Sequence, residues 1–159
     1  MEIEELAGLP AHPLFVHAVV VLVPLATIAT IASVVRPRVR RQLAPVALVL
    51  ALVALVSVGL AQGSGEELEH EVRKTALVRE HTGMGERVLP WAGGLVVVAA
   101  AATGADRLRR RWPRLGTRAA GVALGVLAVV AGAGATVTVV QVGHSGAKAT
   151  WDQVLDDER

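Results

Sequence analysis

The sequence predicts an all-α integral membrane protein, a four-helix transmembrane bundle with up-down-up-down topology. Three observations support this prediction: 53% of the 159 residues are hydrophobic, only 3% are aromatic, and four long apolar stretches contain no Asp, Glu, Lys or Arg. A soluble core of this size would use more large rings and shorter apolar runs. We therefore expect residues 1–159 to form a single integral membrane domain.

The four apolar stretches cover approximately residues 14–35, 43–62, 88–105 and 119–142. A hydrocarbon layer of about 30 Å is crossed by about 20 residues of α-helix, so each stretch is long enough or nearly so. Alternating strand patterns are absent from the sequence, and helices are therefore expected to satisfy the backbone. The third stretch is the shortest, and its helix could begin further upstream, near His81.

A polar segment, residues 63–87, separates the second and third stretches. Its middle part, residues 66–81, has apolar residues at roughly helical spacing, with acidic residues first and basic residues later. This pattern predicts a short amphipathic helix over the outer end of the bundle. Gly63 and Gly65, which precede it, would allow the chain to reverse.

Charge predicts the orientation in the membrane. The two short loops hold ten of the 16 basic residues and one of the 14 acidic residues, Asp106. The ten are Arg36, Arg38, Arg40, Arg41, Arg107, Arg109, Arg110, Arg111, Arg114 and Arg118. Because basic loops stay on the cytoplasmic side, we expect both termini and the central loop to be extracytoplasmic, at the cell (plasma) membrane.

The sequence also excludes several classes of function. Cysteine is absent, which rules out disulfides, thiolate-bound metals and iron–sulfur clusters. The arginines are explained as topology determinants near anionic lipid, and no nucleic-acid or phosphate-binding motif accompanies them. The bilayer is therefore the expected partner, and nucleic acid is not.

All five histidines fall on the predicted extracytoplasmic side: His12, His17, His70, His81 and His144. In an up-down-up-down bundle, alternate helix ends meet at one face, so three helices can present His17, His81 and His144 to one space. Ionisable residues inside a membrane are generally functional. His70 is expected on a polar face, and His12 as a turn residue or an additional metal ligand.

Several motifs resemble a known family. They are LPAHPLFVHAVVVLVPLA at the start, GLAQGSGEE after the second stretch, REHTGMG before the third and VGHSG at the end of the fourth. The chain is similar over nearly its whole length to the bacterial membrane family called domain of unknown function 2231. This resemblance implies a four-helix membrane protein with histidines near one face, and it implies no particular activity.

Two cofactors fit the histidines. A b-type haem would use axial ligands from His17, His81 and His144, and it needs no covalent attachment motif. A copper or zinc ion is the alternative, held by His12, His17, His81 and His144, with Glu80 or Glu86 as further donors. The residue spacing does not decide between them.

The sequence thus favours a membrane protein that binds b-type haem or another transition metal near its extracytoplasmic face and transfers electrons. The alternative is a non-catalytic accessory or assembly subunit whose histidines are structural. In either case, an electron-transfer or accessory role is expected in preference to a stand-alone enzyme. The partner would be another membrane or redox protein, and the oligomeric state is left open.

Overall fold

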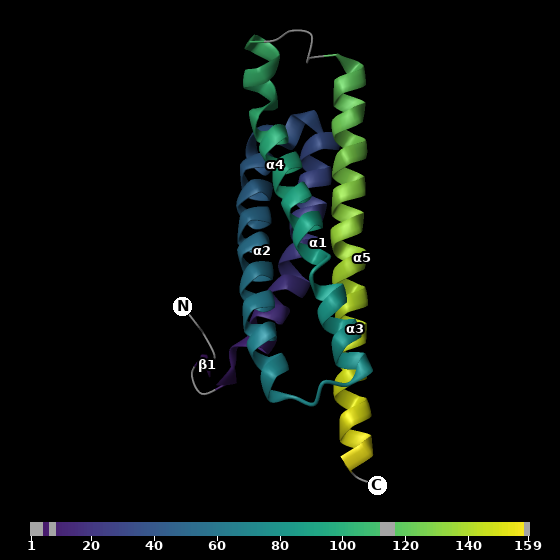
Figure 1. The fold of residues 1–159 in the computed structure, drawn as a ribbon. Helices are drawn as coiled ribbons and strands as arrows, with labels where there is room; N and C mark the ends of the chain where they lie inside the picture. The colour runs from purple at the N-terminus through teal and green to yellow at the C-terminus, as the bar shows by residue number, and fades with distance from the viewer. Residues whose placement is uncertain (1–4, 7–8, 112–116, 158–159) are drawn as a thin grey trace.

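The computed structural model describes residues 5–6, 9–111 and 117–157, and it consists almost entirely of helices (Figure 1). Two strands of two residues each, β1 (Glu5–Leu6) and β2 (Leu9–Pro10), pair antiparallel before the first helix. The helices follow in chain order: α1 (Ala11–Val35), α2 (Pro37–Glu71), α3 (Ala76–Gly85), α4 (Val88–Arg111) and α5 (Arg118–Asp157).

The long helices α1, α2, α4 and α5 form the expected up-down-up-down bundle (Figure 1). Helix α1 packs against α2 and α5, and α4 packs against the same two neighbours, so that α1 and α4 lie diagonally across the bundle. Four helical regions are long and apolar enough to cross a membrane. These candidate spans are Ala11–Val35, Pro37–His70, Ala76–Ala105 and Arg118–Trp151.

Small side chains fill the interior of the bundle. Most of its buried hydrophobic residues are alanine or valine, and Leu95 is the largest side chain that is fully buried. Larger aliphatic residues such as Ile28, Val97 and Val140 lie on the outside, where they are about two-thirds exposed. Because lipid tails are as apolar as the core, close backbone packing through small residues is what holds such helices together.

The segment expected to form one short amphipathic helix is divided differently. Residues 66–71 continue α2 without a break, and α3 begins only at Ala76. The expected helix over residues 66–81 is therefore wrong as a single element. Gly63 and Gly65, where a reversal was expected, both lie inside α2.

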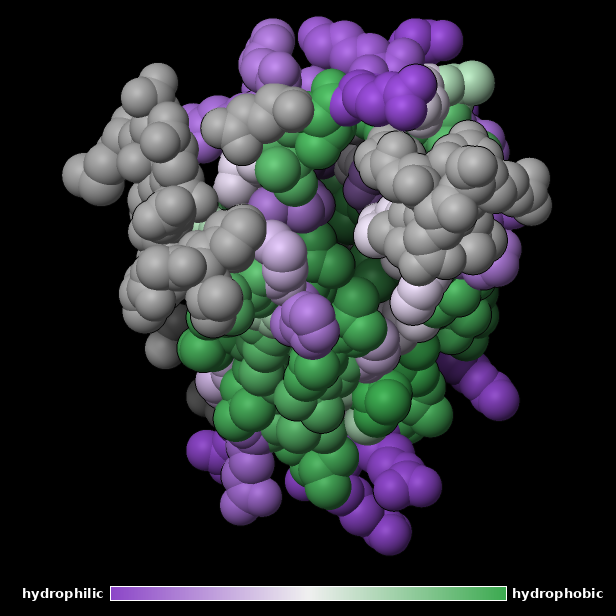
Figure 2. All heavy atoms as spheres, turned by 90° about the horizontal axis from the view of Figure 1, so that it is seen from below, coloured by the Kyte–Doolittle hydropathy of each residue, from purple (hydrophilic) through white to green (hydrophobic). Residues whose placement is uncertain are grey.

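The two ends of the bundle differ in composition, since one is rich in arginine and the other carries the histidines. The α1–α2 turn and the arginine-rich end of α4 lie together at the top of Figure 1. The start of α1, the end of α2, all of α3 and the last part of α5 lie at the bottom, which we call the histidine end. In Figure 2, which views this end, hydrophilic side chains lie around a mainly hydrophobic area.

Candidate functional site

The histidine end contains all five histidines, but they differ in exposure. His12 on α1 and His81 on α3 are half-buried, whereas His17, His70 and His144 are exposed. The structure therefore brings His12 and His81 into the interior. It places His17 and His144, two of the three ligands expected from the sequence, on outward faces of α1 and α5.

His12 is held against α2. Its Nδ1 lies 2.9 Å from the backbone oxygen of Ala61, one helix away. The hydroxyl oxygen of Ser64 lies 3.5 Å from the same nitrogen. The ring rests on Gly65, where a Cβ atom would lie 2.9 Å from the ring carbon Cε1. Gly65 is therefore needed for the imidazole to approach the α2 backbone.

His81 is held against α5 in the same manner. Its Nδ1 lies 3.1 Å from the backbone oxygen of Val142 and 3.1 Å from Oγ of Ser145. The Ser145 hydroxyl itself donates to Val142 O at 2.9 Å, which leaves its oxygen free to accept from the ring. A Cβ atom on Gly146 would lie 2.8 Å from Cε1 of His81.

Local interactions around α3 position His81. Thr75 caps the start of this helix, because its side-chain oxygen accepts a hydrogen bond from Val78 N at 3.2 Å. Near the other end, the Gln62 side-chain amide donates to Gly85 O at 2.9 Å and ties α3 to α2. With His81 bound to α5, the short helix connects both neighbouring long helices.

The hydrogen bonds determine the tautomer of both rings. A backbone carbonyl can only accept, so Nδ1 must carry the proton in His12 and in His81. In the neutral imidazole, Nε2 then has a free lone pair. Neither Nε2 has a hydrogen-bond partner among the residues that the structure describes.

The two half-buried histidines come from different helices, α1 and α3, and each ring is bonded to a different neighbouring helix. Within the described part of the chain, no group of three His, Asp or Glu side chains is placed to hold a metal ion. The arrangement thus offers one imidazole nitrogen from each ring as a donor.

The other expected donors lie apart from this pair. His17 is exposed, and its Nδ1 lies 2.6 Å from Pro13 O on its own helix. The side chains of Glu80 and Glu86 are exposed as well. One carboxylate atom, Oε2 of Glu67, is buried and has no hydrogen-bond partner in the described structure, but Glu67 does not complete a group of three with the histidines.

Sequence reasoning missed the serine and glycine partners of the two rings. Ser64 and Gly65 were read as part of a loop, and Gly146 was given no role. A signal was nevertheless present, because AQGSG and VGHSG both end in Ser-Gly.

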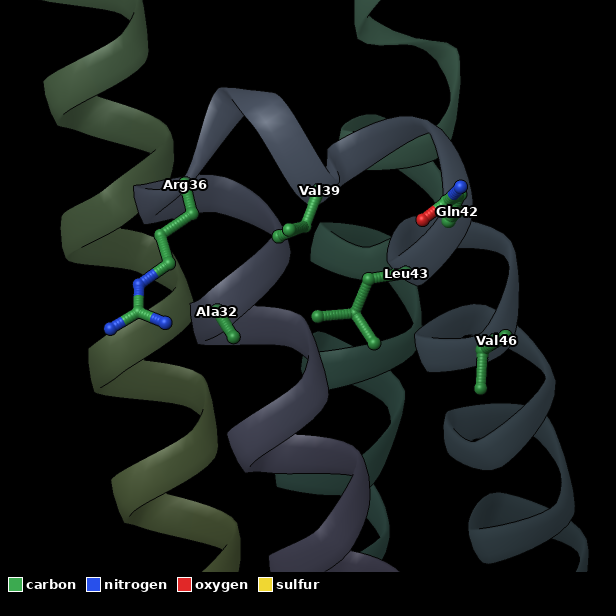
Figure 3. Close-up of a pocket in the computed structure, with 6 residues that line it drawn as sticks. All are labelled: Ala32, Arg36, Val39, Gln42, Leu43 and Val46. Atoms are coloured by element: carbon green, nitrogen blue, oxygen red, sulfur yellow. The ribbon is translucent and has the colours of Figure 1, made fainter.

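The opposite end of the bundle carries a basic surface and a shallow cavity. Arg40 is only 6% exposed, and it donates from Nε to Ser33 O and from Nη2 to Val34 O, both at 3.2 Å. A cavity of about 450 Å³ lies at the same end, between the end of α1 and the start of α2 (Figure 3). Its lining residues are Ala32, Arg36, Val39, Gln42, Leu43 and Val46.

The four apolar helices and their histidine end define a small multi-pass membrane protein. The family model "Predicted membrane protein (DUF2231)" matches residues 8–159, and the chain belongs to this family, as its sequence motifs predicted. No curated protein and no solved structure matches the chain.

Proposed function

We propose that this membrane protein binds a transition-metal ion between His12 and His81, with Nε2 of each ring as the ligand atom. The observation that carries the proposal is the shared geometry of the two rings. Each donates Nδ1–H to a backbone carbonyl and keeps Nε2 free. Histidines that bind metals are commonly held in this way, because the second hydrogen bond fixes both the tautomer and the ring orientation.

Burial further supports a metal role. Each half-buried ring is fixed in place by its Nδ1 bond, and its Nε2 is not among the buried atoms that lack a partner, so this nitrogen is open to an incoming ion. A cation would give each Nε2 the partner that the described residues do not supply. The exposed His17 and His144 have no such need, so the proposed ligand set is His12 and His81 in place of the wider set expected from the sequence.

A bare ion fits this site better than b-type haem. Haem would need a slot for its macrocycle between the two imidazoles. Two cavities of the described structure lie away from the histidine end: one near the α1–α2 turn, and one of about 370 Å³ beside Val35 and Gly125. At the histidine end, the rings themselves fill the space above Gly65 and Gly146.

The location of the site suggests what the ion does. We place the whole chain as one domain in the plasma membrane. Because loops rich in arginine favour the cytoplasmic side, the histidine end would face the outside. Copper held there by imidazole can change its charge by one electron. The protein would thus transfer electrons to or from a redox partner at the extracytoplasmic surface.

Metal analysis of the purified protein tests the proposal. We expect about one copper or zinc ion per chain in the wild type and loss of the ion in His12→Asn and His81→Asn. Asparagine keeps an N–H near the position of Nδ1, so the bond to Ala61 O or Val142 O can persist while the ligand nitrogen is removed.

His17→Ala and His144→Ala are the matched controls, because both side chains are exposed. Both variants should retain the wild-type metal content. A reducible haem absorption band in the wild type that disappears in His12→Asn would show that the site binds haem in place of a bare ion. Folded wild-type protein that binds neither haem nor metal would refute the proposal and leave both rings with a purely structural role.

A further inference from the structure

The cavity between the end of α1 and the start of α2, which we call the α1–α2 cavity, has two kinds of lining (Figure 3). Its apolar lining residues are Ala32, Val39, Leu43 and Val46. Arg36 adds a guanidinium group and Gln42 adds a side-chain amide, at opposite sides of the view in Figure 3. One cavity thus offers both apolar contact and hydrogen-bond donors.

The two kinds of lining follow the boundaries of the apolar stretches. Leu43 and Val46 belong to the apolar stretch of residues 43–62, and Ala32 belongs to that of residues 14–35. Arg36 and Gln42 lie in the polar turn between these stretches. The cavity therefore reaches from the level of this turn into the part of the bundle that is expected to lie in lipid.

The cavity opens to the outside of the bundle. Val39 is 37% exposed and Val46 is 51% exposed. Ala44 and Ala47, which come from the same part of α2, are almost completely buried in the bundle. A molecule that enters the cavity would therefore come from the bilayer.

The polar part of the cavity is positively charged. Residues 36–42 contain four arginines and no acidic residue. Arg40 is bonded to carbonyl groups of α1, whereas Arg36, Arg38 and Arg41 are exposed. Helix α2 also starts here, so the positive end of its dipole adds to the potential. The ligand that complements this lining is an anion joined to an apolar chain.

We infer that the α1–α2 cavity binds an anionic phospholipid. Its phosphate group lies against the guanidinium group of Arg36 and accepts a hydrogen bond from the Gln42 amide, and one acyl chain runs along Leu43 and Val46. Planar guanidinium groups bind pairs of phosphate oxygens. Basic pockets between transmembrane helices on the cytoplasmic side bind anionic headgroups. This inference is independent of the proposed metal site, which lies at the other end of the bundle (Figure 1).

Two other occupants match the lining less well. A free phosphate ion would contact Arg36 and Gln42 and leave the apolar lining uncovered. A helix from a second copy of the chain would cover the apolar lining, but it would also remove water from the guanidinium group without supplying an anion. A phospholipid matches both parts of the lining.

The test measures the unfolding midpoint of the full-length protein in detergent during titration with phosphatidylglycerol or with phosphatidylcholine of the same acyl chains. A ligand that binds the folded state raises the midpoint. We expect this rise with phosphatidylglycerol, and little effect of phosphatidylcholine or inorganic phosphate at the same concentration. Arg36→Gln should weaken the apparent affinity for phosphatidylglycerol by about 10-fold or more, because it removes hydrogen bonds between charged groups.

Arg38→Gln and Arg41→Gln are the matched controls, because each removes the same charge from an exposed position outside the cavity lining. Both should keep most of the affinity for phosphatidylglycerol. Arg36→Lys keeps the charge and loses the planar group, so its affinity should lie between those of the wild type and Arg36→Gln.

Four results would overturn the inference. Equal losses in Arg36→Gln, Arg38→Gln and Arg41→Gln would reduce the effect to diffuse attraction between charges. An equal rise with inorganic phosphate would make the ligand a free anion, and an equal rise with phosphatidylcholine would remove the role of headgroup charge. Disulfide cross-linking between two chains that carry Val46→Cys would place a second copy of the chain at the cavity.

Discussion

Gly146 lies directly against the imidazole of His81, with so little space that a Cβ atom there would come within 2.8 Å of the ring. Gly65 has the same relationship to His12 at 2.9 Å. These distances are shorter than ordinary carbon–carbon contacts, so any side chain at either glycine must displace a ring. The glycines thereby set how closely α1 approaches α2 and α3 approaches α5.

Gly65→Ala and Gly146→Ala should both destabilise the protein and reduce metal binding. The added methyl group forces the ring outward and breaks its bond to the backbone oxygen, an overpacking cost of about 1–3 kcal/mol. The measurements are the thermal unfolding midpoint in detergent and the metal content of the purified variants.

Gly63→Ala and Gly143→Ala are close controls, because each lies in the same helix with nothing within 4 Å of the added atom. Alanine is the better helix former, so these changes should be neutral or stabilising by up to about 1 kcal/mol. Equal effects at all four glycines would mean that contact with the rings is not what matters.

Arg40→Ala should weaken the arginine-rich end of the bundle. The guanidinium group satisfies two of the last carbonyl groups of α1, those of Ser33 and Val34. Such carbonyls have no partner within their own helix. Loss of the two hydrogen bonds should lower the free energy of unfolding by about 1–3 kcal/mol, which would be measured as a lower unfolding midpoint in detergent.

Arg38→Ala and Arg41→Ala provide the comparison, since both side chains are exposed. They should change stability little. Arg40→Lys keeps the charge but cannot reproduce the two bonds of the planar group, and it should fall between wild type and Arg40→Ala. An unfolding midpoint equal to that of the wild type for Arg40→Ala would show that water fully replaces the guanidinium group at the two carbonyl groups.

Gly134→Ala should loosen the packing of α4 against α5. The indole ring of Trp91 packs directly on Gly134, and an added Cβ would overlap the ring carbons. We expect a loss of about 1–3 kcal/mol in stability, again from the unfolding midpoint.

A double-mutant cycle with Trp91→Ala tests this contact. Once the ring is removed, Gly134→Ala should cost nothing further, so the two changes should be strongly non-additive. Gly59→Ala is the control, because nothing lies within 4 Å of its added atom. Additive effects at residues 91 and 134 would contradict the proposed contact.

The absence of cysteine makes membrane orientation directly measurable. Glu66→Cys and Thr150→Cys introduce thiols at exposed positions of the histidine end, and Arg38→Cys introduces one at the opposite end. With an impermeant maleimide on intact cells, the first two should be labelled and the third should react only after permeabilisation. The reverse pattern would place the histidine end in the cytoplasm.

The number and order of the long helices could be predicted from apolar runs, but their ends could not. Helix α2 continues to Glu71, nine residues beyond the predicted limit at residue 62. Hydropathy reports which residues tolerate lipid, whereas a helix backbone satisfies its own hydrogen bonds in water as well. Acidic residues therefore marked the expected edge of the membrane without marking the end of the helix.

The choice among histidines depended on helix phase, which the sequence did not reveal. His17 was favoured because apolar residues surround it along the chain, yet its side chain is exposed. His12 was expected as a turn residue or an additional metal ligand; α1 already starts at Ala11 and directs the ring toward α2. Two residues five positions apart lie on different sides of a helix, so only one of them can face the bundle.

The length of α5 has a consequence for how the protein meets its surroundings. Its 40 residues correspond to about 60 Å of helix, twice the thickness of about 30 Å that lipid tails occupy. Ordinary tilt cannot absorb that excess. The final turns extend beyond the other helices at the bottom of Figure 1, and we therefore expect them to project from the membrane into water. This end of α5 is thus expected to be accessible from the aqueous phase.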